Sequence, residues 1–482
     1  MPHQYINRKK LILLVVLFII LLSALRLGWL AVFHNDVDGQ PLISEGELDL
    51  RGWEGLSSET IALDGEWRFF PGKLATSGQT ETWGDFNLVD VPGDWNDRKS
   101  NGSLDYYGTY KLRIIVEEND DDVFSLVVPS VRNASELYVN GRLIDQSGQV
   151  SESESQYLAK NIPYTASFTA DDDGVIEIML QATNYLDSSE GAIARSIKFG
   201  ESSQVRSENL ISYSMQLIVM VAFLIYTTFA IGLFFVNERN GTYINASFLL
   251  LCAIVTHSLG SDEKLITYWF QLDYAWNIRV ANLASTGMIF SLWMIVKGSF
   301  GKSQKIIHTV VLTICVVSLI AILTLPLIDL FQIQDVFNAL LIVTLVLVII
   351  SMFKVQSLQR EDTVWIVYAL LALLNSYIWW GVWNSLGVNV FFYPIDLIIM
   401  IGCFTIMWFI RYFNMYNKSK EQASRLKNVS EEKDEFLART SHELRNPLHG
   451  ILNLTQTTLD RNKGVFDQKK SKRIRNSNNG RE

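Results

Sequence analysis

Cysteine is scarce in this sequence. Only Cys252, Cys315 and Cys403 occur, and each lies in an apolar stretch where it can pack as a small hydrophobic side chain. The acidic segment 35–205 contains none, so its own apolar core must hold it together, for which about 170 residues are enough. No Cys/His spacing typical of a metal site occurs in the chain, and no metal ligand is predicted.

Basic residues are also scarce in that segment. Residues 35–205 carry 31 Asp and Glu against 12 Lys and Arg, a net charge of −19, whereas residues 411–482 carry 16 Lys and Arg against 9 Asp and Glu, a net charge of +7. The two regions therefore face different environments. A basic tail is compatible with nucleic acid, but positive charge just inside a membrane is the commoner cause, so no nucleic-acid partner is predicted.

Apolar runs, by contrast, are long and numerous, and 49% of the residues are hydrophobic. A basic cluster at residues 8–10 precedes an apolar run over 11–33, which is the layout of an export signal. The run is longer than the core of a usual signal peptide, and Arg26 interrupts it. An uncleaved signal anchor, a transmembrane helix over 1–34, is preferred to a cleaved signal; either predicts that the following segment is exported.

Seven further apolar runs are long enough to cross a bilayer, which takes about 20 residues in a helix. They cover 210–236, 243–260, 275–297, 306–326, 336–353, 364–386 and 389–411. Alternate loops hold the basic residues Arg239, Lys297, Lys302, Lys305, Lys354, Arg360, Arg411, Lys418 and Lys420, whereas the other loops hold only Lys264. Because Lys and Arg are retained on the cytoplasmic side, the pattern predicts a multi-pass protein of the cell membrane, in contact with lipid. Its seven-helix domain spans 206–413 and its C-terminus is cytoplasmic.

Segment 35–205 has the patterns of an all-β domain. Apolar residues alternate at Tyr110, Leu112, Ile114 and Val116, and again at Ile176, Ile178 and Leu180. Asn140-Gly141 lies between two apolar stretches and predicts a type I′ hairpin, because both residues tolerate a positive φ. The predicted fold is an antiparallel β-sandwich.

Four motifs of this segment resemble the jelly-roll sugar-binding domain of family 2 glycoside hydrolases. They are LDGEWRF at 63–69, VPGDWN at 91–96, YGTY at 107–110 and LYVNG at 137–141. With the seven runs that follow, the layout over about 45–413 resembles bacterial seven-transmembrane receptors with diverse intracellular signalling modules. The resemblance implies an external ligand, with carbohydrate as its class. Trp67, Trp95 and Tyr107 are expected to lie in the core rather than to stack on a sugar.

After Tyr416 the chain becomes polar and rich in helix formers. Residues recur three and four apart at Leu426, Val429, Lys433, Phe436, Thr440 and Glu443, a weak heptad in which Lys433 occupies a core position. Segment 414–435 is therefore predicted to be either a coiled-coil-like linker that pairs in a homodimer or a solvated linker helix. Both alternatives stay open at this point.

Residues 436–448, FLARTSHELRNPL, closely resemble the H box of histidine kinases. An apolar stripe of Leu437, Leu444, Leu448, Ile451 and Leu452 is expected to bury one helix face and to leave His442 exposed on another. A neutral imidazole, with an unperturbed pKa of about 6.5, can attack a γ-phosphoryl group without a strong base. His442 is therefore the predicted phosphoacceptor.

The neighbours of His442 have roles that the resemblance implies. Glu443 is the general base that takes the proton from the other ring nitrogen. Asn446, at i+4, shares the face of His442 and orients water for dephosphorylation of the partner. Pro447 is expected to bend the helix. His449, together with two histidines in the apolar runs, His257 and His308, is predicted to have no catalytic role.

The domain that positions ATP and Mg²⁺ in histidine kinases is missing from the sequence. Only 34 residues follow Leu448, and they contain no Asn-rich nucleotide box, no Asp-x-Gly-x-Gly and no Gly-rich lid. Residues 464–475 are expected to form the loop and the opening of a second helix. Segment 436–482 is thus a truncated phosphoacceptor domain, and a frameshift, an engineered end or a natural short form would all produce it. No cofactor is expected in this chain, whereas the intact family uses ATP and Mg²⁺.

Two charged residues lie in the interior of the seven later spans, where charge is unfavourable. Arg279 of the third span and Asp396 of the seventh, two residues after Pro394, are expected to form a structural pair rather than a site for a ligand or proton. The seventh span contains no Lys, which excludes a retinal Schiff base.

These features predict a dimeric receptor of the sensor histidine kinase type. An external ligand would act through seven helices on the His442 helix. A kinase domain acting in trans would phosphorylate His442, and the phosphoryl group would pass to the receiver domain of a response regulator. The alternative is a non-catalytic ligand-binding receptor or dimerising regulator that sequesters full-length partners. A glycoside hydrolase is disfavoured because the catalytic barrel is absent.

Overall fold

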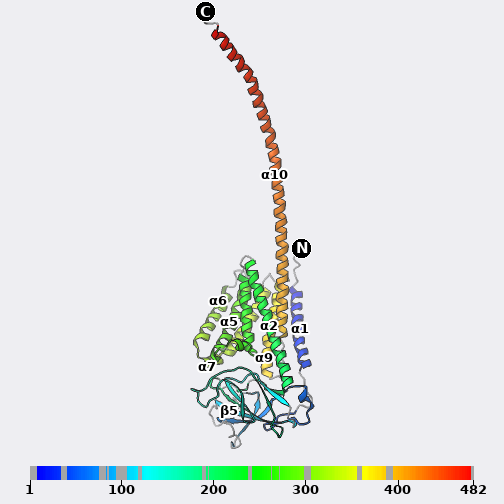
Figure 1. Ribbon diagram of the computed structural model, residues 1–482, viewed down its shortest axis with the longest axis vertical. Coiled ribbons are helices and arrows are strands. Elements are labelled where there is room, and N and C mark those ends of the chain that lie inside the picture. The colour runs from blue at the N-terminus through cyan, green and yellow to red at the C-terminus, as the bar shows by residue number, and fades with distance from the viewer. Residues whose placement is uncertain are drawn as a thin grey trace. The chain divides into compact units, whose positions relative to one another are not determined.

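The computed structural model describes residues 8–33, 41–74, 83, 86–93, 106–117, 122–186, 192–193, 195–236, 241–261, 263–270, 272–297, 305–354, 361–386 and 394–478. They form two compact units, Met1–Met407 and Trp408–Glu482. The first unit contains a β-sheet domain and a group of apolar helices, whereas the second consists of most of one long helix (Figure 1).

The β-sheet domain contains eleven strands among the described residues. They are β1 Glu47–Asp49, β2 Ile61–Ala62, β3 Gly65–Pro71, β4 Asn87–Val91, β5 Tyr107–Ile115, β6 Val123–Val128, β7 Ala134–Val139, β8 Arg142–Ser147, β9 Tyr164–Thr169, β10 Val175–Thr183 and β11 Lys198–Glu201, with a short 3-10 helix, η1, at Glu54–Ser57. One sheet has the order β4-β3-β5-β10-β7-β8, with β1 added beside β5, and the other has the order β2-β11-β6-β9. One hydrophobic core draws on both sheets, from Leu112 and Ile178 of the first to Leu126 and Phe199 of the second.

The alternation seen in the sequence is confirmed in the two central strands. Tyr110, Leu112 and Ile114 of β5 are buried, and they pair in register with Leu180, Ile178 and Ile176 of β10. Trp67 is fully buried, and its indole Nε1 donates a hydrogen bond to the carbonyl of Leu63 at 2.9 Å, so it belongs to the core as expected. Tyr107 is half-buried, and Trp95 lies outside the described residues.

The predicted hairpin is confirmed, but one strand pair is not antiparallel. Asn140 and Gly141 both have positive φ angles, 48° and 75°, and join β7 to β8. β1 pairs with β5 in parallel, which corrects the expectation of a purely antiparallel fold. The reason is that β3 pairs only with residues 108–111 of β5, so the rest of that edge would be open without β1.

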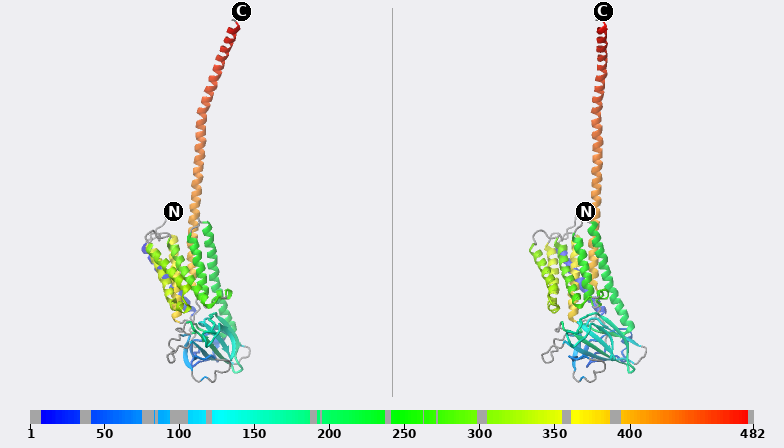
Figure 2. Two further views of the ribbon diagram at one scale, coloured as in Figure 1. Left: turned by 90° about the vertical axis from the view of Figure 1, so that its left-hand side faces the viewer. Right: turned by 60° about the vertical axis from the view of Figure 1, so that its left-hand side comes forward.

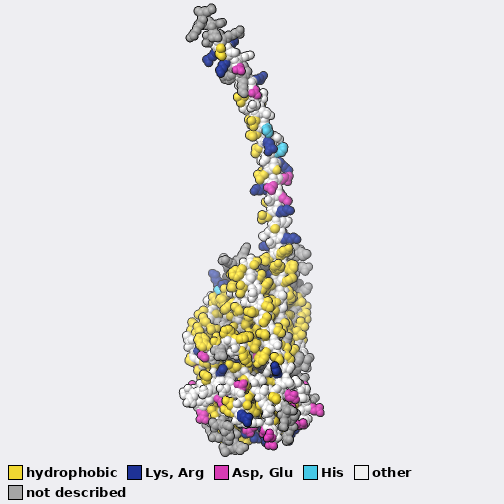
Figure 3. All heavy atoms as spheres, viewed as in Figure 1, with side chains coloured by type: hydrophobic (Ala, Val, Ile, Leu, Met, Phe, Trp, Pro, Cys, Tyr) yellow, Lys and Arg dark blue, Asp and Glu magenta, His cyan; other side chains and the backbone are white. Residues whose placement is uncertain are grey.

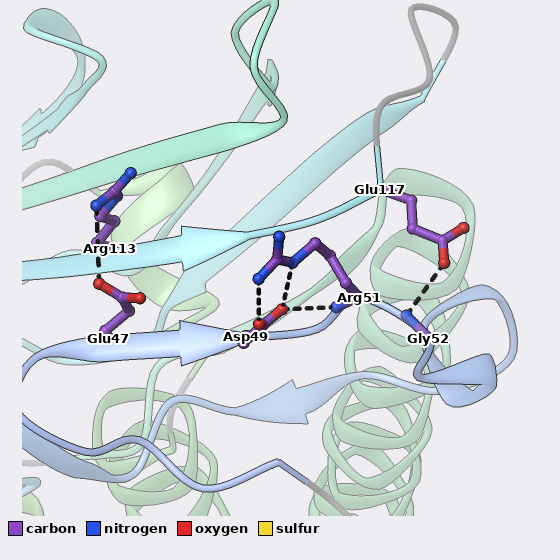
Figure 4. A network of polar contacts seen from close by, with 6 residues as sticks. All are labelled: Glu47, Asp49, Arg51, Gly52, Arg113 and Glu117. Atoms are coloured by element: carbon purple, nitrogen blue, oxygen red, sulfur yellow. Dashed lines mark hydrogen bonds and ion pairs between the residues drawn. The ribbon is translucent and has the colours of Figure 1, made fainter.

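A polar network lies on the surface beside this parallel pair (Figure 4). Asp49 accepts hydrogen bonds from Nε, Nη2 and the backbone N of Arg51 at 2.9, 2.6 and 3.1 Å, and Gly52 N donates to Glu117 at 3.1 Å. The side-chain hydrogen bonds from Arg51, followed by its backbone N–H, lower the pKa of the Asp49 carboxyl to about 2. Both side chains are exposed, so the network orders the turn after β1 and adds little to stability.

The helices of the first unit are mostly apolar. They are α1 Arg8–Phe33, α2 Ser202–Val236, α3 Gly241–Gly260, α4 Ile266–Trp269, α5 Tyr274–Lys297, α6 Lys305–Thr324, α7 Leu327–Gln332, α8 Gln334–Lys354, α9 Glu361–Leu386 and the beginning of α10 Ile395–Asn478. By length and composition, six helices in the described part of the chain could cross a membrane: α1, α2, α3, α5, α6 and α10. The apolar stretches described in α8 and α9, Val336–Ile350 and Val364–Trp379, are shorter. Hydrophobic side chains cover the visible face of the helices, and acidic ones gather on the β-sheet domain (Figure 3).

The three cysteines are buried in these helices, as expected. His308 of α6 is also structural, because its Nδ1 accepts a hydrogen bond from Nε1 of Trp293 in α5 at 2.8 Å.

α2 continues directly from β11 and is bonded to the β-sheet domain along its first turns. Glu208 accepts hydrogen bonds from Thr60 at 2.6 Å and from Lys198 at 3.0 Å. Gln204 Nε2 donates to the carbonyl of Ser57 at 3.1 Å. These contacts tie one end of α2 to both η1 and the smaller sheet.

The predicted pairing of Arg279 with Asp396 is wrong. Arg279 donates to the carbonyls of Ile322 and Leu325, at 2.8 Å for the latter, and so satisfies carbonyls at the C-terminal end of α6 that have no partner within the helix. Asp396 pairs instead with Arg26 of α1, through Nη2 to Oδ2 at 2.6 Å. Arg279 is thus bonded to backbone carbonyls and Asp396 to Arg26, and the two do not pair with each other.

The predicted loop at 464–475 is also wrong, because α10 is continuous to Asn478. A single Gly costs only about 1 kcal/mol relative to Ala within a helix, and the good helix formers Gln468, Lys469 and Lys470 follow Gly464 within two turns. The helix is continuous through Pro447. Figure 2 shows that its orange-to-red part is curved and has no break.

We expect Leu112→Ala to lower the free energy of unfolding of the β-sheet domain by about 2–5 kcal/mol, because it leaves a cavity in a fully buried position of the central strand β5. Pulse proteolysis of the full-length protein in detergent across a urea gradient measures the change. Leu88→Ala, on strand β4 at 44% exposure, is the matched control and should change stability by less than about 1 kcal/mol. Equal effects of the two substitutions would contradict the assigned core.

Candidate phosphoacceptor site

From Tyr416 onward, the helix that carries the predicted site is exposed at every side chain whose burial is described except the half-buried Thr440. Ion pairs at i,i+4 spacing line it: Glu421 with Arg425 at 2.7 Å, and Glu435 with Arg439 at 2.9 Å. Each such pair stabilises a helix by roughly 0.2–0.5 kcal/mol. Local propensity and these pairs, rather than a packed core, therefore account for the helix here.

His442 lies on this helix with its side chain exposed, as predicted. At about 100° per residue, Asn446 lies some 40° from His442 around the helix axis, so the two share a face. Glu443 is the adjacent residue, about 100° away. The three predicted site residues thus occupy exposed, neighbouring positions, with nothing in the described part of the second unit covering them.

The apolar stripe lies on the side of the helix away from His442. Leu444, two residues on, is about 200° around the axis. The stripe residues Leu437, Leu444, Leu448, Ile451 and Leu452 are exposed by 50, 65, 61, 61 and 55%. The expectation that this face is buried is therefore not met within one chain, because no second helix in the described part of the unit packs against it. An exposed apolar face of this length is typical of an interaction surface.

The side chains just before His442 bond within their own helix. Arg439, one turn before it, is held by Glu435, and the hydroxyl of Thr440 donates to the carbonyl of Phe436 at 2.6 Å. An exposed imidazole can be reached by a phosphoryl donor and then by a receiving carboxylate. The site is open to a second protein from the whole polar side of the helix.

His449 was predicted to have no catalytic role, yet it lies on the same helix face as His442. The two are seven residues apart, which is about 20° around the axis, and both are exposed. The heptad spacing of the two imidazoles is visible in the sequence and could have been used. Of the other two histidines that were set aside, His257 has its Nε2 buried within α3.

Comparison with known families supports the phosphoacceptor segment. Residues 432–479 match the family model of the His Kinase A (phospho-acceptor) domain. The match covers the H box and supports a phosphoacceptor role of the sensor histidine kinase type. Such domains typically dimerise and work with response regulators. The comparison with curated proteins gave no match.

Several solved structures share a weak likeness. A Ruminococcus gnavus β-glucuronidase is 15% identical, covering 29% of this chain and 27% of its own, with a TM-score of 0.24. An Eisenbergiella tayi family 2 β-galacturonidase bound to galacturonate is 18% identical, covering 30% and 24%, with a TM-score of 0.21. An uncultured Clostridium β-glucuronidase is 17% identical, covering 29% and 28%, with a TM-score of 0.23. The chain thus spans about a quarter of these enzymes, and scores this low carry no conclusion about its activity.

Exposure of the imidazoles can be tested chemically. In the full-length protein in detergent, we expect diethyl pyrocarbonate to modify His442 and His449 at least tenfold faster than His257, because only a solvent-accessible ring nitrogen reacts. Peptide mass spectrometry over a time course gives the three rates. Equal rates at His442 and His257 would contradict the open site.

Proposed function

We propose that this chain is a membrane receptor of the sensor histidine kinase type whose His442 accepts a phosphoryl group. The observation that carries the proposal is the H box within the matched segment, with its His on the open side of a helix whose other side is an apolar stripe. An acceptor must be reachable, and the helix that presents it needs a partner on its apolar side. Both conditions hold at this one place in the chain.

The chemistry requires little from the helix itself. A neutral nitrogen of His442 attacks the γ-phosphorus of ATP, the bond to the bridging oxygen breaks, and ADP leaves with the electron pair. The proton on the other ring nitrogen passes to Glu443. A carboxylate of a receiver domain then attacks the phosphorus, the N–P bond breaks with its electron pair left on the ring, and Glu443 returns the proton, which releases neutral His442. Asn446 would orient the water that later removes the phosphoryl group from the receiver.

In histidine kinases ATP and Mg²⁺ are held by a kinase domain, and we propose that such a domain acts on His442 in trans. The printed residues after the H box contain none of the nucleotide-binding motifs of that domain. What this chain supplies is the acceptor nitrogen, the adjacent carboxylate and the amide one turn on.

We further propose the orientation and the sensing role. The acidic β-sheet domain would lie outside the cell as a jelly-roll sensor for a ligand of the carbohydrate class. The helices of 206–413 would cross the membrane seven times and leave the C-terminus in the cytoplasm. Support comes from the loop charges, from the acidic surface of the β-sheet domain and from the family 2 motifs.

Phosphoryl transfer is tested with the full-length protein in detergent, incubated with labelled ATP alone and with an intact histidine kinase. We expect label on wild type only in the mixed reaction, and at least a hundredfold less on His442→Gln, which keeps a polar side chain but lacks the acceptor nitrogen. His449→Gln is the matched control on the same face and should keep the label.

No label on wild type in the mixed reaction would favour the alternative, a binding-only or dimerising regulator. Label on wild type alone would contradict phosphorylation of His442 in trans. Equal labelling of His442→Gln and wild type would contradict the acceptor assignment itself.

The apolar stripe should pair two copies of the chain. We expect Leu444→Glu with Leu448→Glu to raise the dimer dissociation constant at least tenfold, about 1.4 kcal/mol, because two carboxylates would be buried without partners. Analytical ultracentrifugation in detergent measures this. Asn453→Glu, on the His442 side, is the control and should leave the constant within twofold. An unchanged dimer in the double variant would contradict pairing through the stripe.

A further inference from the structure

The N-terminal helix α1 has one packed face. Its buried residues Val15, Leu22 and Arg26 are seven and four apart, so they lie on one narrow stripe of the helix. The exposed apolar residues of α1 cover the rest of its circumference: Ile12, Leu13, Val16, Leu17, Ile19, Ile20, Leu21, Leu25 and Leu27. The only charged residue inside the apolar run therefore points toward other helices, not away from them.

Arg26 meets a carboxylate that another helix provides. Its Nε and Nη2 donate to Oδ2 of Asp396 in the first turn of α10, at 2.9 and 2.6 Å. The other oxygen, Oδ1, accepts a hydrogen bond from Nδ2 of Asn375 in α9 at 3.0 Å. Both charged side chains are fully buried. Three helices, α1, α9 and α10, thus meet at one carboxylate, and Figure 1 shows α1 beside the first part of α10.

A second contact holds α1 against α9. The rings of Phe18 and Tyr368 stack with their centroids 4.5 Å apart and their planes 26° apart. Phe18 lies two turns before Arg26, near the same stripe. Two contacts, about two turns apart, therefore attach α1 to its neighbours: the aromatic contact to α9 and the ion pair to α10.

Loss of α1 would leave Asp396 buried with only the amide of Asn375. A buried carboxylate without its cation is strongly unfavourable, and an Arg within an apolar helix is unfavourable without an anion. The ion pair thus lowers the free-energy cost of burying both Arg26 and Asp396 among apolar helices. A segment used only to direct export needs neither a packed stripe nor a buried partner for its Arg.

We propose that α1 is a permanent helix of the membrane bundle, retained after export, and that Arg26, Asp396 and Asn375 form the polar junction that locks it to the first turn of α10. The N-terminal helix is then a partner of the helix that begins at Ile395, although the two lie at opposite ends of the chain. The proposal does not depend on phosphoryl transfer to His442, and its test contains no phosphorylation step.

Retention is measured first on the wild type. The full chain carries one epitope tag before residue 1 and another after residue 482, and membranes are probed for both. We expect both tags on one band of full-length mass, and mass spectrometry should find the peptides of α1 in the purified protein. Loss of the N-terminal tag from the membrane-bound protein would overturn the proposal.

The junction is then tested by charge exchange. Arg26→Leu and Asp396→Leu should each lower the melting temperature of the purified protein by several degrees, whereas Arg26→Asp combined with Asp396→Arg should recover at least half of the loss. The amide of Asn375 can turn its oxygen toward the new Arg. Leu25→Ala, next to Arg26 on the exposed side of α1, is the matched control and should stay within one degree of wild type.

Single variants as stable as wild type, or an exchanged pair no better than the single variants, would overturn the lock. If the single variants cannot be purified, the wild-type tag and the exchanged pair still decide the question. A folded exchanged pair that keeps its N-terminal tag supports the proposal, and a pair that fails to fold contradicts it.

Discussion

Polar side chains among apolar helices have no water to hydrate them, and this constraint decides how the helices of the first unit are held together. Arg26 and Asp396 satisfy each other. Arg279 satisfies carbonyls at the end of α6, whose own helix leaves them without partners. His308 and Trp293 satisfy each other between α5 and α6. Each of these polar contacts joins two helices. The contacts that lower the free-energy cost of burying polar groups therefore also determine which helices lie side by side.

The same constraint explains why the partner of Asp396 could not be read from the sequence. Periodicity places a residue on a face of its own helix but does not tell which helix lies opposite. Arg279 and Arg26 were both available, and they are 117 and 370 positions from Asp396. Only the packing of α1 against α9 and α10 distinguishes them. Val15 and Leu22 share the face of Arg26, but the exposed side chains of α1 are equally apolar, so this buried face could not be recognised from the sequence.

Local patterns were sufficient where neighbouring residues decide the structure. Asn140-Gly141 predicts its hairpin because two positive φ angles are needed there, and the alternation in β5 and β10 predicts which side chains enter the core. The H box likewise places His442 opposite the apolar stripe, since helix geometry alone fixes that relation. The loop expected at 464–475 failed because it was inferred from the two-helix layout of a family. One Gly is too small a cost to end the helix, and no described residue of the second unit folds back on the stripe.

The two units therefore differ in whether their apolar side chains are covered within one chain. In the β-sheet domain, two sheets cover each other, and Leu112, Leu126 and Phe199 share one core without any disulfide. In the second unit a single helix has no second layer, so its stripe is exposed.

The two kinds of surface have different consequences. The β-sheet domain is complete by itself, and its bonds to Glu208 and Gln204 mean that a displacement of its sheets must carry the first turns of α2 with it. The His442 helix is incomplete by itself, so its state depends on what covers the stripe.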